Sequence, residues 1–300
     1  MELRQLKYFL KAKELLNFTE AAKVLNISQS TLSQQIKQLE DELNVLLFDR
    51  IGKRIMLTEA GEMFSEYALQ SINRANEGLL LLKDLNNINT GKITIGVIYS
   101  MRILFAKALI QFAKQYPNIK IQVVFGTTKD LLEKLNTHHF DFILTFYENV
   151  KQPNLKYQAL LNSNMVLVTA KKSSLANKRS ISLTEVADLP LALPFSGYST
   201  IQFFVESFRQ KNLRPNICME INDIPTLFEI VKTGHWHTIL SETSVNDPHV
   251  VGIPIEGKNM KRTIMIVSLK EAYEKKAVKK FYEQLIGEEF GRKGKHLIKS

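Results

Sequence analysis

The stretch that decides the fold of the first part of the chain is residues 17–43, which read NFTEAAKVLNISQSTLSQQIKQLEDEL. Asn17 can cap a first helix, with Glu20 three positions later as its reciprocal partner. The segment Asn-Ile-Ser at positions 26–28 favours a short turn, whose serine can cap a second helix. The pattern predicts two helices joined by a tight turn, a helix-turn-helix at residues 19–42.

The second of these helices has two different faces. Its apolar positions recur at spacings of four, three and four and form a buried stripe of Leu32, Ile36, Leu39 and Leu43. The opposite face is polar and consists of Gln29, Ser30, Ser33, Gln34 and Lys37. Such a face can enter the major groove of DNA, where glutamine and serine reach base edges. The alternative is an ordinary amphipathic helix with a solvated face.

A small basic segment follows this helix. Residues 49–58 read DRIGKRIMLT, so that Arg50, Lys53 and Arg54 cluster around Gly52. We interpret the segment as a two-stranded wing, which suits contact with phosphates or with the minor groove. The alternative is a structural turn that carries charges.

Residues 59–88 follow one long helical pattern, which ends in the Asn- and Gly-rich segment 86–91. Its apolar stripe consists of Ala60, Phe64, Tyr67, Ala68, Ile72, Ala75, Leu79 and Leu82. We interpret this stripe as a contact surface for a second copy of the helix. Packing against the first domain of the same chain is the alternative.

After Gly91, β-branched runs alternate with amphipathic segments. Strands are predicted at Ile93–Val97, Ile121–Phe125, Phe140–Thr145, Lys156–Leu161, Met165–Thr169, Leu191–Leu193, Ile217–Ile221, Thr238–Leu240 and Ile264–Ser268. Helices are predicted at Leu104–Tyr116, Asp130–Asn136, Ile201–Lys211, Ile224–Lys232 and Glu271–Ile286. The alternation predicts a mainly parallel sheet with helices on both faces. Two such α/β halves leave a cleft in which a ligand can bind.

Composition limits the remaining possibilities. The formal net charge of +10 lies outside residues 1–90, where acidic and basic residues nearly balance, so bulk charge is no argument for nucleic-acid binding. No apolar run is long enough to span a membrane, and the N-terminus lacks the apolar core of a secretory signal. The single cysteine excludes an intramolecular disulfide. These features lead us to expect a cytoplasmic protein.

Residues 1–66 resemble the N-terminal domain of LysR-type transcriptional regulators. The matching positions are Leu6, Phe9, Phe18–Ala22, Leu25, Ser28, Gln29, Leu32, Ser33, Ile36, Leu39, Glu40, Leu43, Leu47–Arg50 and Leu57–Gly61. The resemblance implies an α+β multidomain protein with a winged helix-turn-helix DNA-binding domain (1–58), a linker and dimerisation helix (59–90) and an α/β effector-binding domain (91–300). Its two subdomains, 91–161 with 268–300 and 162–267, would resemble the periplasmic solute-binding fold.

The resemblance also assigns roles in DNA binding. The implied contacts are Gln29 and Ser33 to bases, Thr31 and Arg50 to the DNA backbone, and Lys53 and Arg54 from the wing. The chain departs from the family at Ser30, where proline is common, and at Gln34, where arginine is common. Both stay candidate contacts, as does Lys37. The family also implies a homodimer, and often a homotetramer, on an inverted-repeat operator in double-stranded DNA.

The turns that follow the predicted strands and lead into helices form the candidate effector site. Strand ends that face helix N-termini offer backbone N–H groups to anions and carbonyls. The candidates are Ser100, Met101, Arg102, Thr127, Thr128, Phe146, Phe195, Ser196 and Ile224. Ser100 matches a family position that often bonds the effector, and we expect a small polar or anionic metabolite. Helix capping alone is the alternative for Ser100, Thr128 and Ser196.

Other chemistry has weaker support in the sequence. His235 and His237 share one face of an extended segment, so a metal site is conceivable, but a loop around a buried Trp236 is favoured. Cys218 is interpreted as a buried strand thiol rather than a redox sensor. The sequence contains no nucleophile elbow, P-loop, dinucleotide-binding turn or HExxH helix. The sequence therefore predicts no cofactor, no metal ion and no enzymatic activity. The alternatives to an effector-controlled regulator are an architectural DNA-binding protein and an α/β enzyme.

Overall fold

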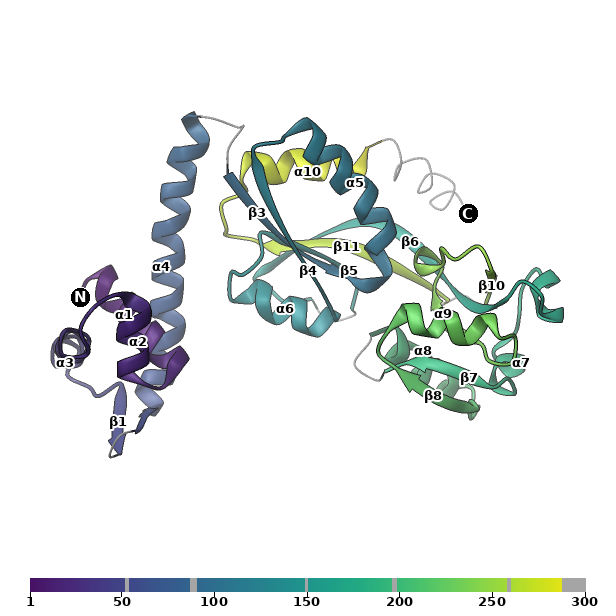
Figure 1. Ribbon diagram of the computed structural model, residues 1–300, viewed down its shortest axis with the longest axis horizontal. Coiled ribbons are helices and arrows are strands. Elements are labelled where there is room, and N and C mark those ends of the chain that lie inside the picture. Colours follow the sequence, from purple (N-terminus) through teal and green to yellow (C-terminus); the bar gives the residue numbers. More distant parts are fainter. Residues whose placement is uncertain (52–53, 87–90, 149–150, 196–198, 258–259, 288–300) are drawn as a thin grey trace. The chain divides into compact units, whose positions relative to one another are not determined.

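The computed structural model describes residues 1–300 except 52–53, 87–90, 149–150, 196–198, 258–259 and 288–300. The chain divides into two compact units, Met1–Asn86 and Asn87–Ser300 (Figure 1). Within the described residues, no helix combines the length and the apolar character that a membrane span requires.

The first unit is helical and carries one β-hairpin. Its elements are α1 (Leu3–Leu15), α2 (Phe18–Leu25), α3 (Gln29–Leu43), β1 (Phe48–Ile51), β2 (Arg54–Leu57) and α4 (Glu59–Asn86). In its core the ring of Phe48 meets those of Phe9 and Phe18, with centres 5.5 Å apart in both pairs. The helix-turn-helix predicted from residues 17–43 is confirmed as α2 and α3.

The helix caps follow the sequence prediction with one exception. Asn17 Oδ1 accepts two backbone hydrogen bonds from the first turn of α2, at 2.9 and 3.2 Å. Ser28 Oγ accepts the backbone N–H of Thr31 at 3.0 Å. The carboxylate of Glu20 instead accepts a hydrogen bond from Lys23, so the predicted reciprocal cap is wrong. A nearby lysine one turn away on α2 competes for this carboxylate.

The long helix α4 packs on the first unit over its first half. Ala68 is buried in the core that α1, α2 and α3 share. Gly61 approaches Leu47 so closely that a Cβ atom at this position would clash with the Leu47 carbonyl oxygen. Farther along α4, the side chains of Leu79 and Leu82 are 59% and 58% exposed. Within the predicted stripe, Ala68 and Ile72 therefore pack in their own unit, whereas Tyr67, Leu79 and Leu82 are exposed.

The second unit is an α/β domain. Its strands are β3 (Gly91–Ile98), β4 (Ile119–Gly126), β5 (Phe142–Phe146), β6 (Leu155–Ala170), β7 (Leu191–Pro194), β8 (Ile217–Ile221), β9 (Thr238–Ser241), β10 (Val250–Pro254) and β11 (Lys261–Leu269). Its helices are η1 (Tyr99–Met101), α5 (Arg102–Gln115), α6 (Thr128–Asn136), η2 (Ser174–Asn177), α7 (Leu183–Ala187), α8 (Ser199–Gln210), α9 (Ile224–Lys232), η3 (Glu242–Ser244) and α10 (Lys276–Ile286).

The larger sheet is mixed, so the prediction of a mainly parallel sheet is wrong. Its strand order is β10-β6-β11-β5-β3-β4, and β9 pairs with β6 as well. β3 runs parallel to β4 and β5, whereas the pairs made by β6 and β11 are antiparallel. β6 pairs with β11 over its first part and with β9 and β10 over its second. This one strand therefore connects the two halves of the unit.

Several predicted boundaries differ from the structure. The strands predicted at Lys156–Leu161 and Met165–Thr169 are one strand, β6, because its polar middle at 162–164 continues to pair with β11. Helix α10 begins at Lys276, later than predicted, and β10 and α7 were not predicted. Cys218 is exposed rather than buried, because β8 has only one neighbour, β7, in its two-stranded sheet.

Two large hydrophobic cores and a smaller third one, which includes Val168 and Val231, stabilise the second unit. In the first, α5 and α10 lie side by side on one face of the sheet, where the ring centres of Phe112 and Phe281 are 4.8 Å apart, and α6 covers the other face (Figure 1). The second core is separate and includes Met165, Leu191 and Phe204. The two large cores define two halves of the unit, and apolar and hydroxyl-bearing residues together line the junction between them.

Candidate functional site

The outward face of α3 carries the residues that the sequence assigns to DNA. Gln29, Ser30, Thr31, Gln34 and Lys37 are exposed, and Ser33 is half-buried. The opposite face is fully buried at Leu32, Ile36 and Leu39. The helix is thus fixed in rotation by its apolar stripe, and its polar face is presented to solvent.

Hydroxyl groups at the start of α3 have structural partners. Ser28 Oγ lies 2.8 Å from Ser30 Oγ and 2.7 Å from Thr31 Oγ1. These three hydroxyls form a cluster around the helix cap, which orients Ser30 and Thr31 at the N-terminus. The longer side chains of Gln29, at the first position of α3, and of Gln34 and Lys37, farther along the helix, are exposed on the same face.

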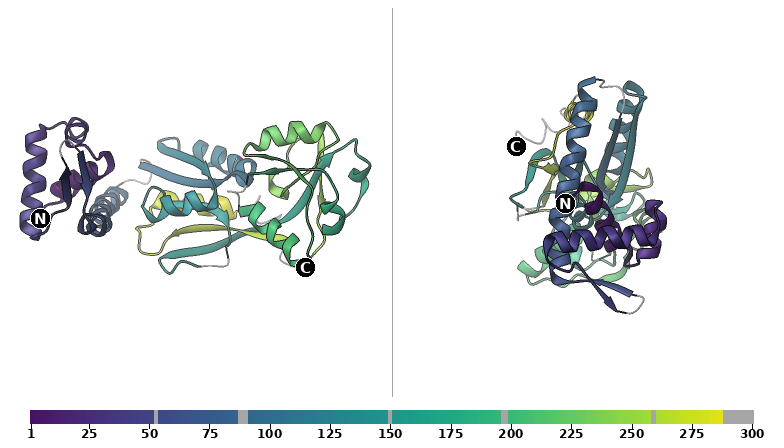
Figure 2. Two further views of the ribbon diagram at one scale, coloured as in Figure 1. Left: turned by 90° about the horizontal axis from the view of Figure 1, so that it is seen from below. Right: turned by 90° about the vertical axis from the view of Figure 1, so that its left-hand side faces the viewer.

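The predicted wing is a β-hairpin. β1 and β2 pair antiparallel, with Arg50 opposite Ile55 and Ile51 opposite Arg54. This register puts Arg50 and Arg54 close to the tip, and the hairpin extends away from the helices of the first unit (right view of Figure 2). Lys53 lies outside the described residues.

Glu40 connects the recognition helix to the wing, a role that the sequence reasoning did not assign. Its side chain is 5% exposed. Oε1 accepts hydrogen bonds from the backbone N–H groups of Leu47 at 2.8 Å and Phe48 at 3.1 Å. A buried carboxylate with two amide donors fixes the path of the chain from α3 into β1. A charged residue at an otherwise apolar helix position was the available signal.

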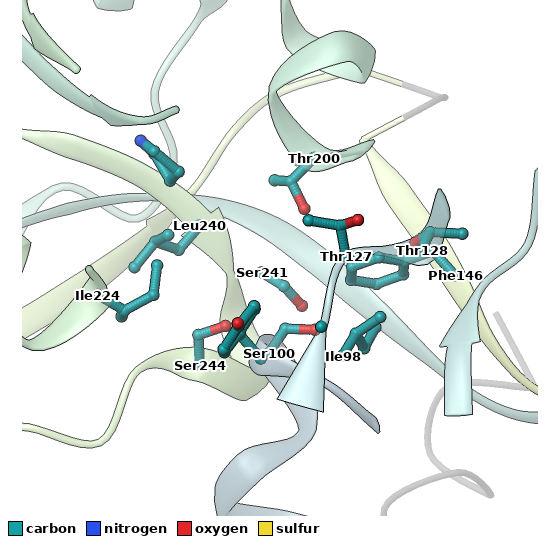
Figure 3. Close-up of a pocket in the computed structure, with 13 residues that line it drawn as sticks. Ile98, Ser100, Thr127, Thr128, Phe146, Thr200, Ile224, Leu240, Ser241 and Ser244 are labelled. Carbon is teal, nitrogen blue, oxygen red and sulfur yellow. The ribbon is translucent and has the colours of Figure 1, made fainter. Parts of the chain in front are cut away.

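The second unit contains an inner cavity at the junction of its two halves. Its volume is about 30 Å³, enough for one or two water molecules. It is lined by Ile98, Tyr99, Ser100, Gly126, Thr127, Thr128, Phe146, Pro194, Thr200, Ile224, Leu240, Ser241 and Ser244. Side chains from both halves face this common space (Figure 3). Five of the predicted effector residues meet here: Ser100, Thr127, Thr128, Phe146 and Ile224.

The hydroxyls around the inner cavity differ in their hydrogen bonding. Thr127 Oγ1 caps α6 by accepting the backbone N–H of Asp130, and Thr128 Oγ1 accepts a hydrogen bond from Thr145 at 2.9 Å. By contrast, Ser100 Oγ is buried and has no hydrogen-bond partner among the described residues. Capping therefore explains Thr127 but does not explain Ser100.

A larger outer pocket of about 270 Å³ adjoins the inner cavity. The two share Tyr99, Ser100, Ile224 and Ser244. Arg102 lines the outer pocket rather than the inner cavity, and its guanidinium lies 5.7 Å from the ring centre of Phe125. The outer pocket adds charged and apolar groups that the inner cavity lacks, including Glu229, Asp247 and Phe228.

Two predicted effector residues are misplaced. Met101 is fully buried in the core of the first half, because successive residues of the tight turn η1 point in different directions. Phe195 is 55% exposed and lines neither the inner cavity nor the outer pocket. Ser196 lies outside the described residues.

The cavity also contains residues that the sequence reasoning missed. Thr200 is the second residue of α8, Ser241 ends β9 and Ser244 ends η3. Ser241 Oγ lies 2.6 Å from Ser163 Oγ on β6. A signal was present for Ser241, since it directly follows a predicted strand, the same rule that identified Ser100.

The structure gives no support to a metal site at His235 and His237. His237 is 5% exposed, and its Nδ1 lies 3.0 Å from Thr169 Oγ1. No group of three potential ligands from His, Cys, Asp and Glu occurs in the part of the chain that is described. Burial lowers the pKa of His237, and the neighbouring His235 lowers it further. His237 is therefore a neutral core residue at pH 7.

Comparison with known protein families matches both units. Residues 3–62 match the model of the bacterial regulatory helix-turn-helix protein, lysR family, and residues 86–288 match that of the LysR substrate binding domain. The HTH-type transcriptional regulator BsdA of Bacillus subtilis is 29% identical over 269 residues, which cover 89% of this chain and 90% of BsdA. The HTH-type transcriptional regulator AlsR of the same organism is 30% identical over 247 residues, 81% of this chain and 82% of AlsR.

Solved structures share the fold. A full-length variant of OxyR from Pseudomonas aeruginosa has a TM-score of 0.75 and 22% sequence identity, over 97% of both chains. Full-length CbnR complexed with its target DNA has a TM-score of 0.66 and 22% identity, over 95% of this chain and 99% of that one. The arrangement of a helix-turn-helix followed by an α/β domain is thus common to these chains.

Proposed function

Because this chain belongs to the LysR family of DNA-binding transcriptional regulators, we propose that its inner cavity binds a small effector that changes how the chain acts on its operator. The observation that carries the proposal is the buried Ser100 hydroxyl, which lacks a hydrogen-bond partner among the described residues and lines the cavity. A buried polar group without a partner costs about 1–3 kcal/mol. A ligand that supplies the missing hydrogen bond removes this cost.

The sizes of the two spaces limit the effector. The inner cavity of about 30 Å³ accepts only a small polar group, whereas the outer pocket of about 270 Å³ has room for a larger body. We expect a polar or anionic head near Ser100 and a remainder that extends past Arg102. Because the walls come from both halves, such a ligand favours one relative position of the halves and shifts their equilibrium.

The proposed DNA contacts follow the exposed face of α3. Gln29 and Ser33 are assigned to base edges in the major groove and Thr31 to the backbone. Arg50, Lys53 and Arg54 are assigned to the backbone or minor groove beside the hairpin. Ser30, Gln34 and Lys37 complete the proposed surface.

We also propose that the chain acts as a homodimer or homotetramer in the cytoplasm. The outward-facing leucines at the end of α4 suit pairing with the same helix of a second copy. A symmetric dimer presents two copies of α3, which matches an inverted-repeat operator. The subdomain boundaries at residues 161–162 and 267–268 are part of this proposal.

Two alternatives make different predictions. An architectural DNA-binding protein has no use for a cavity with a buried, unpartnered hydroxyl at the junction of two halves, so the cavity favours an effector-controlled regulator. An enzyme that acts through a side-chain hydroxyl nucleophile needs a base beside it. None of the described residues that line the inner cavity is His, Cys, Lys, Asp or Glu, and we therefore propose no catalytic activity.

The test measures whether a small molecule that binds the chain also changes its binding to DNA. Metabolites are screened by thermal shift, because an effector at about 100 times its dissociation constant stabilises the chain by about 2.7 kcal/mol. The operator is selected from random DNA and footprinted with and without each hit. Ser100→Trp should bind the operator as the parent does but lose the stabilisation and the change in footprint. Ser174→Trp, at an exposed serine of η2, is the matched control.

The DNA surface is tested on the same operator. Gln29→Ala and Ser33→Ala should reduce discrimination between the operator and single-base variants by about 1–3 kcal/mol per lost contact. Gln38→Ala, at another exposed glutamine of α3, should leave discrimination unchanged. Unaltered footprints in the Gln29 and Ser33 variants contradict the assigned face, and a response that survives Ser100→Trp contradicts the proposed effector site.

A further inference from the structure

Arg262 on β11 is a buried cation behind one wall of the inner cavity. It is 8% exposed, and its guanidinium carbon lies 4.1 Å from the ring centre of Phe146. Phe146 is 3% exposed and lines the cavity (Figure 3). The guanidinium also lies 5.5 Å from the ring centre of Phe203 on α8. A positive charge is therefore in direct contact with the cavity wall and with a ring of the other half.

The ladder partner of Arg262 also leads to the same cavity. In the β6–β11 ladder Arg262 pairs with Ser163, so the two side chains lie on one face of the sheet. Ser163 Oγ lies 2.6 Å from Ser241 Oγ, and Ser241 lines the cavity. Arg262 thus contacts the cavity wall at Phe146 on β5, and its ladder partner Ser163 on β6 bonds a second lining residue, Ser241 on β9.

Arg262 carries its charge at neutral pH. Burial lowers the pKa of its guanidinium to about 10, and the carboxylate of Glu148 acts in the opposite direction. A pKa near 10 leaves the group protonated at pH 7. Glu148 is exposed, so water screens its charge more effectively than that of the buried arginine.

We propose that Arg262 makes the inner cavity selective for anionic effectors, carboxylates in particular, over neutral molecules of the same shape. The inference rests on the proposed function, that this cavity binds the effector. The described lining residues offer hydroxyls and no charged side chain, and hydroxyls bond neutral and anionic groups alike. The positive charge of Arg262 behind Phe146 favours anionic ligands over neutral ones. The N-terminus of α6 at Thr128 also favours anions, because the helix dipole is positive there.

The test uses a thiol as a probe of charge in the cavity. Ser100→Cys puts an ionisable group at the cavity wall, and Cys218→Ser removes the native thiol. Thiolate formation is followed by ultraviolet absorbance as pH is raised, in the Arg262 parent and in Arg262→Met, Arg262→Gln and Arg262→Lys. A nearby cation lowers the pKa of a thiol, whose ordinary value is about 8.5.

We expect the introduced thiol to have a pKa about one unit higher in Arg262→Met and Arg262→Gln than in the parent, a tenfold change in its acid constant. Arg262→Lys keeps the charge and should keep the lower value. Equal values in the parent and the neutral variants overturn the proposal. So does a lysine variant that behaves like the neutral ones, because the cause is then shape rather than charge.

Alkylation measures the preference for an anion directly. Iodoacetate and iodoacetamide have nearly the same shape and differ in charge, and the ratio of their rates cancels changes in thiol reactivity. With Arg262 present, the iodoacetate-to-iodoacetamide ratio at the introduced thiol should exceed the ratio at the exposed native Cys218 about tenfold. This comparison needs no Arg262 variant, so it stands if the neutral variants fail to fold. A ratio no higher than that at Cys218 overturns the proposal.

The outcome separates this inference from the proposed function. The thiol measurements require no effector, so an absent anion preference overturns the role of Arg262 alone. If a neutral effector is found whose response is lost in Ser100→Trp, the proposed function stands and the inference fails. If the thiol shows the anion preference but Ser100→Trp leaves the effector response intact, the proposed function fails at this site.

Discussion

Ser100 and Met101 were both predicted at the effector site because they follow a strand, but only one of them lines the cavity. Ser100 was predicted because it follows a strand and precedes a helix, and it lines the cavity. Its neighbour Met101 was predicted by the same argument and is buried in the core. The sequence pattern identifies the turn between β3 and α5 but not the direction in which each of its side chains points. That direction is set by the backbone conformation of η1, which no spacing rule specifies.

Residues contributed by distant segments were harder to predict. Thr200 reaches the cavity from the first turn of α8 and Ser244 from the end of η3, and both positions depend on tertiary packing. Arg262 lies two residues before the predicted strand Ile264–Ser268, and its place in β11 and its burial became evident only from the neighbouring strands and rings. Charged residues in strands usually face solvent, so sequence alone favours the opposite expectation.

His237 leads to a prediction about pH. Burial lowers its pKa, so the native state binds fewer protons than the unfolded state once the pH falls below about 6.5. The contribution of His237 to stability is complete above that pH and is lost progressively as the pH falls toward its lowered native pKa. We expect the stability of the second unit to decline from pH 7.5 to pH 5, with His237 contributing up to about 1.4 kcal/mol per pH unit.

The measurement is urea unfolding of the chain across this pH range, followed by the fluorescence of Trp236. His237→Gln removes the titrating group and should flatten the decline, although it lowers stability at all pH values through lost packing. His139→Gln, at a histidine of the first half, is the control. A parent and a His237→Gln variant with the same pH slope would show that His237 does not cause the decline.

At the scale of elements, local signals predicted the caps of α2 and α3 but not the continuity of β6. Asn17 and Ser28 act as the expected caps, because a cap depends on residues three positions apart. β6 was predicted as two strands because its middle is polar. Those polar residues lie where the strand passes between the halves, and Thr263 on β11 donates a hydrogen bond to Asn162 at 2.7 Å. Pairing with a distant strand overrode the local pattern.

The connection between α3 and the wing gives an element-scale prediction. Glu40→Ala removes the acceptor for two buried backbone N–H groups, those of Leu47 and Phe48. Leaving both without a partner should destabilise the first unit by at least about 2 kcal/mol. Glu40→Gln retains an acceptor oxygen and should lose less. Hydrogen exchange read by mass spectrometry in peptides from residues 1–86 isolates this unit from the second.

The expected pattern is faster exchange across α3 and β1 in Glu40→Ala, with exchange in the second unit unchanged. Operator affinity should fall with it, because the recognition helix and the hairpin lose their fixed relation. Equal exchange in Glu40→Ala and the parent would show that these two hydrogen bonds do not stabilise the unit.

For the molecule as a whole, the sequence predicted the order of the parts but not the form of the sheet. A helix-turn-helix, a long helix and an α/β domain follow from local periodicity and are confirmed. The mixed sheet depends on β6 and β11 crossing between the halves, and antiparallel partners so far apart in sequence leave no local signature. The same crossing forms the polar junction where the cavity lies, so the site and the unpredicted feature coincide.

The assembly of the whole molecule depends on the end of α4. Leu79 and Leu82 are exposed in the single chain, and we expect them to be buried against a second copy. Joining two copies makes binding to the second half-site intramolecular, which raises affinity by about 10²–10⁴. Leu79→Glu combined with Leu82→Glu puts charges in this contact and should separate the copies. Affinity for a two-half-site operator should then fall at least about 100-fold, and affinity for a single half-site should stay the same.

Light scattering and fluorescence anisotropy on both DNA lengths measure the two effects. Gln70→Glu adds a charge at an exposed polar position of α4 and should change neither mass nor affinity. Loss of affinity for the single half-site as well would indicate damage to the first unit rather than to the assembly. A double variant that keeps the mass of the parent and its affinity for both DNA lengths would exclude the α4 leucines from the dimer contact. The apolar end of the helix would then have no part in presenting two copies of α3 to the operator.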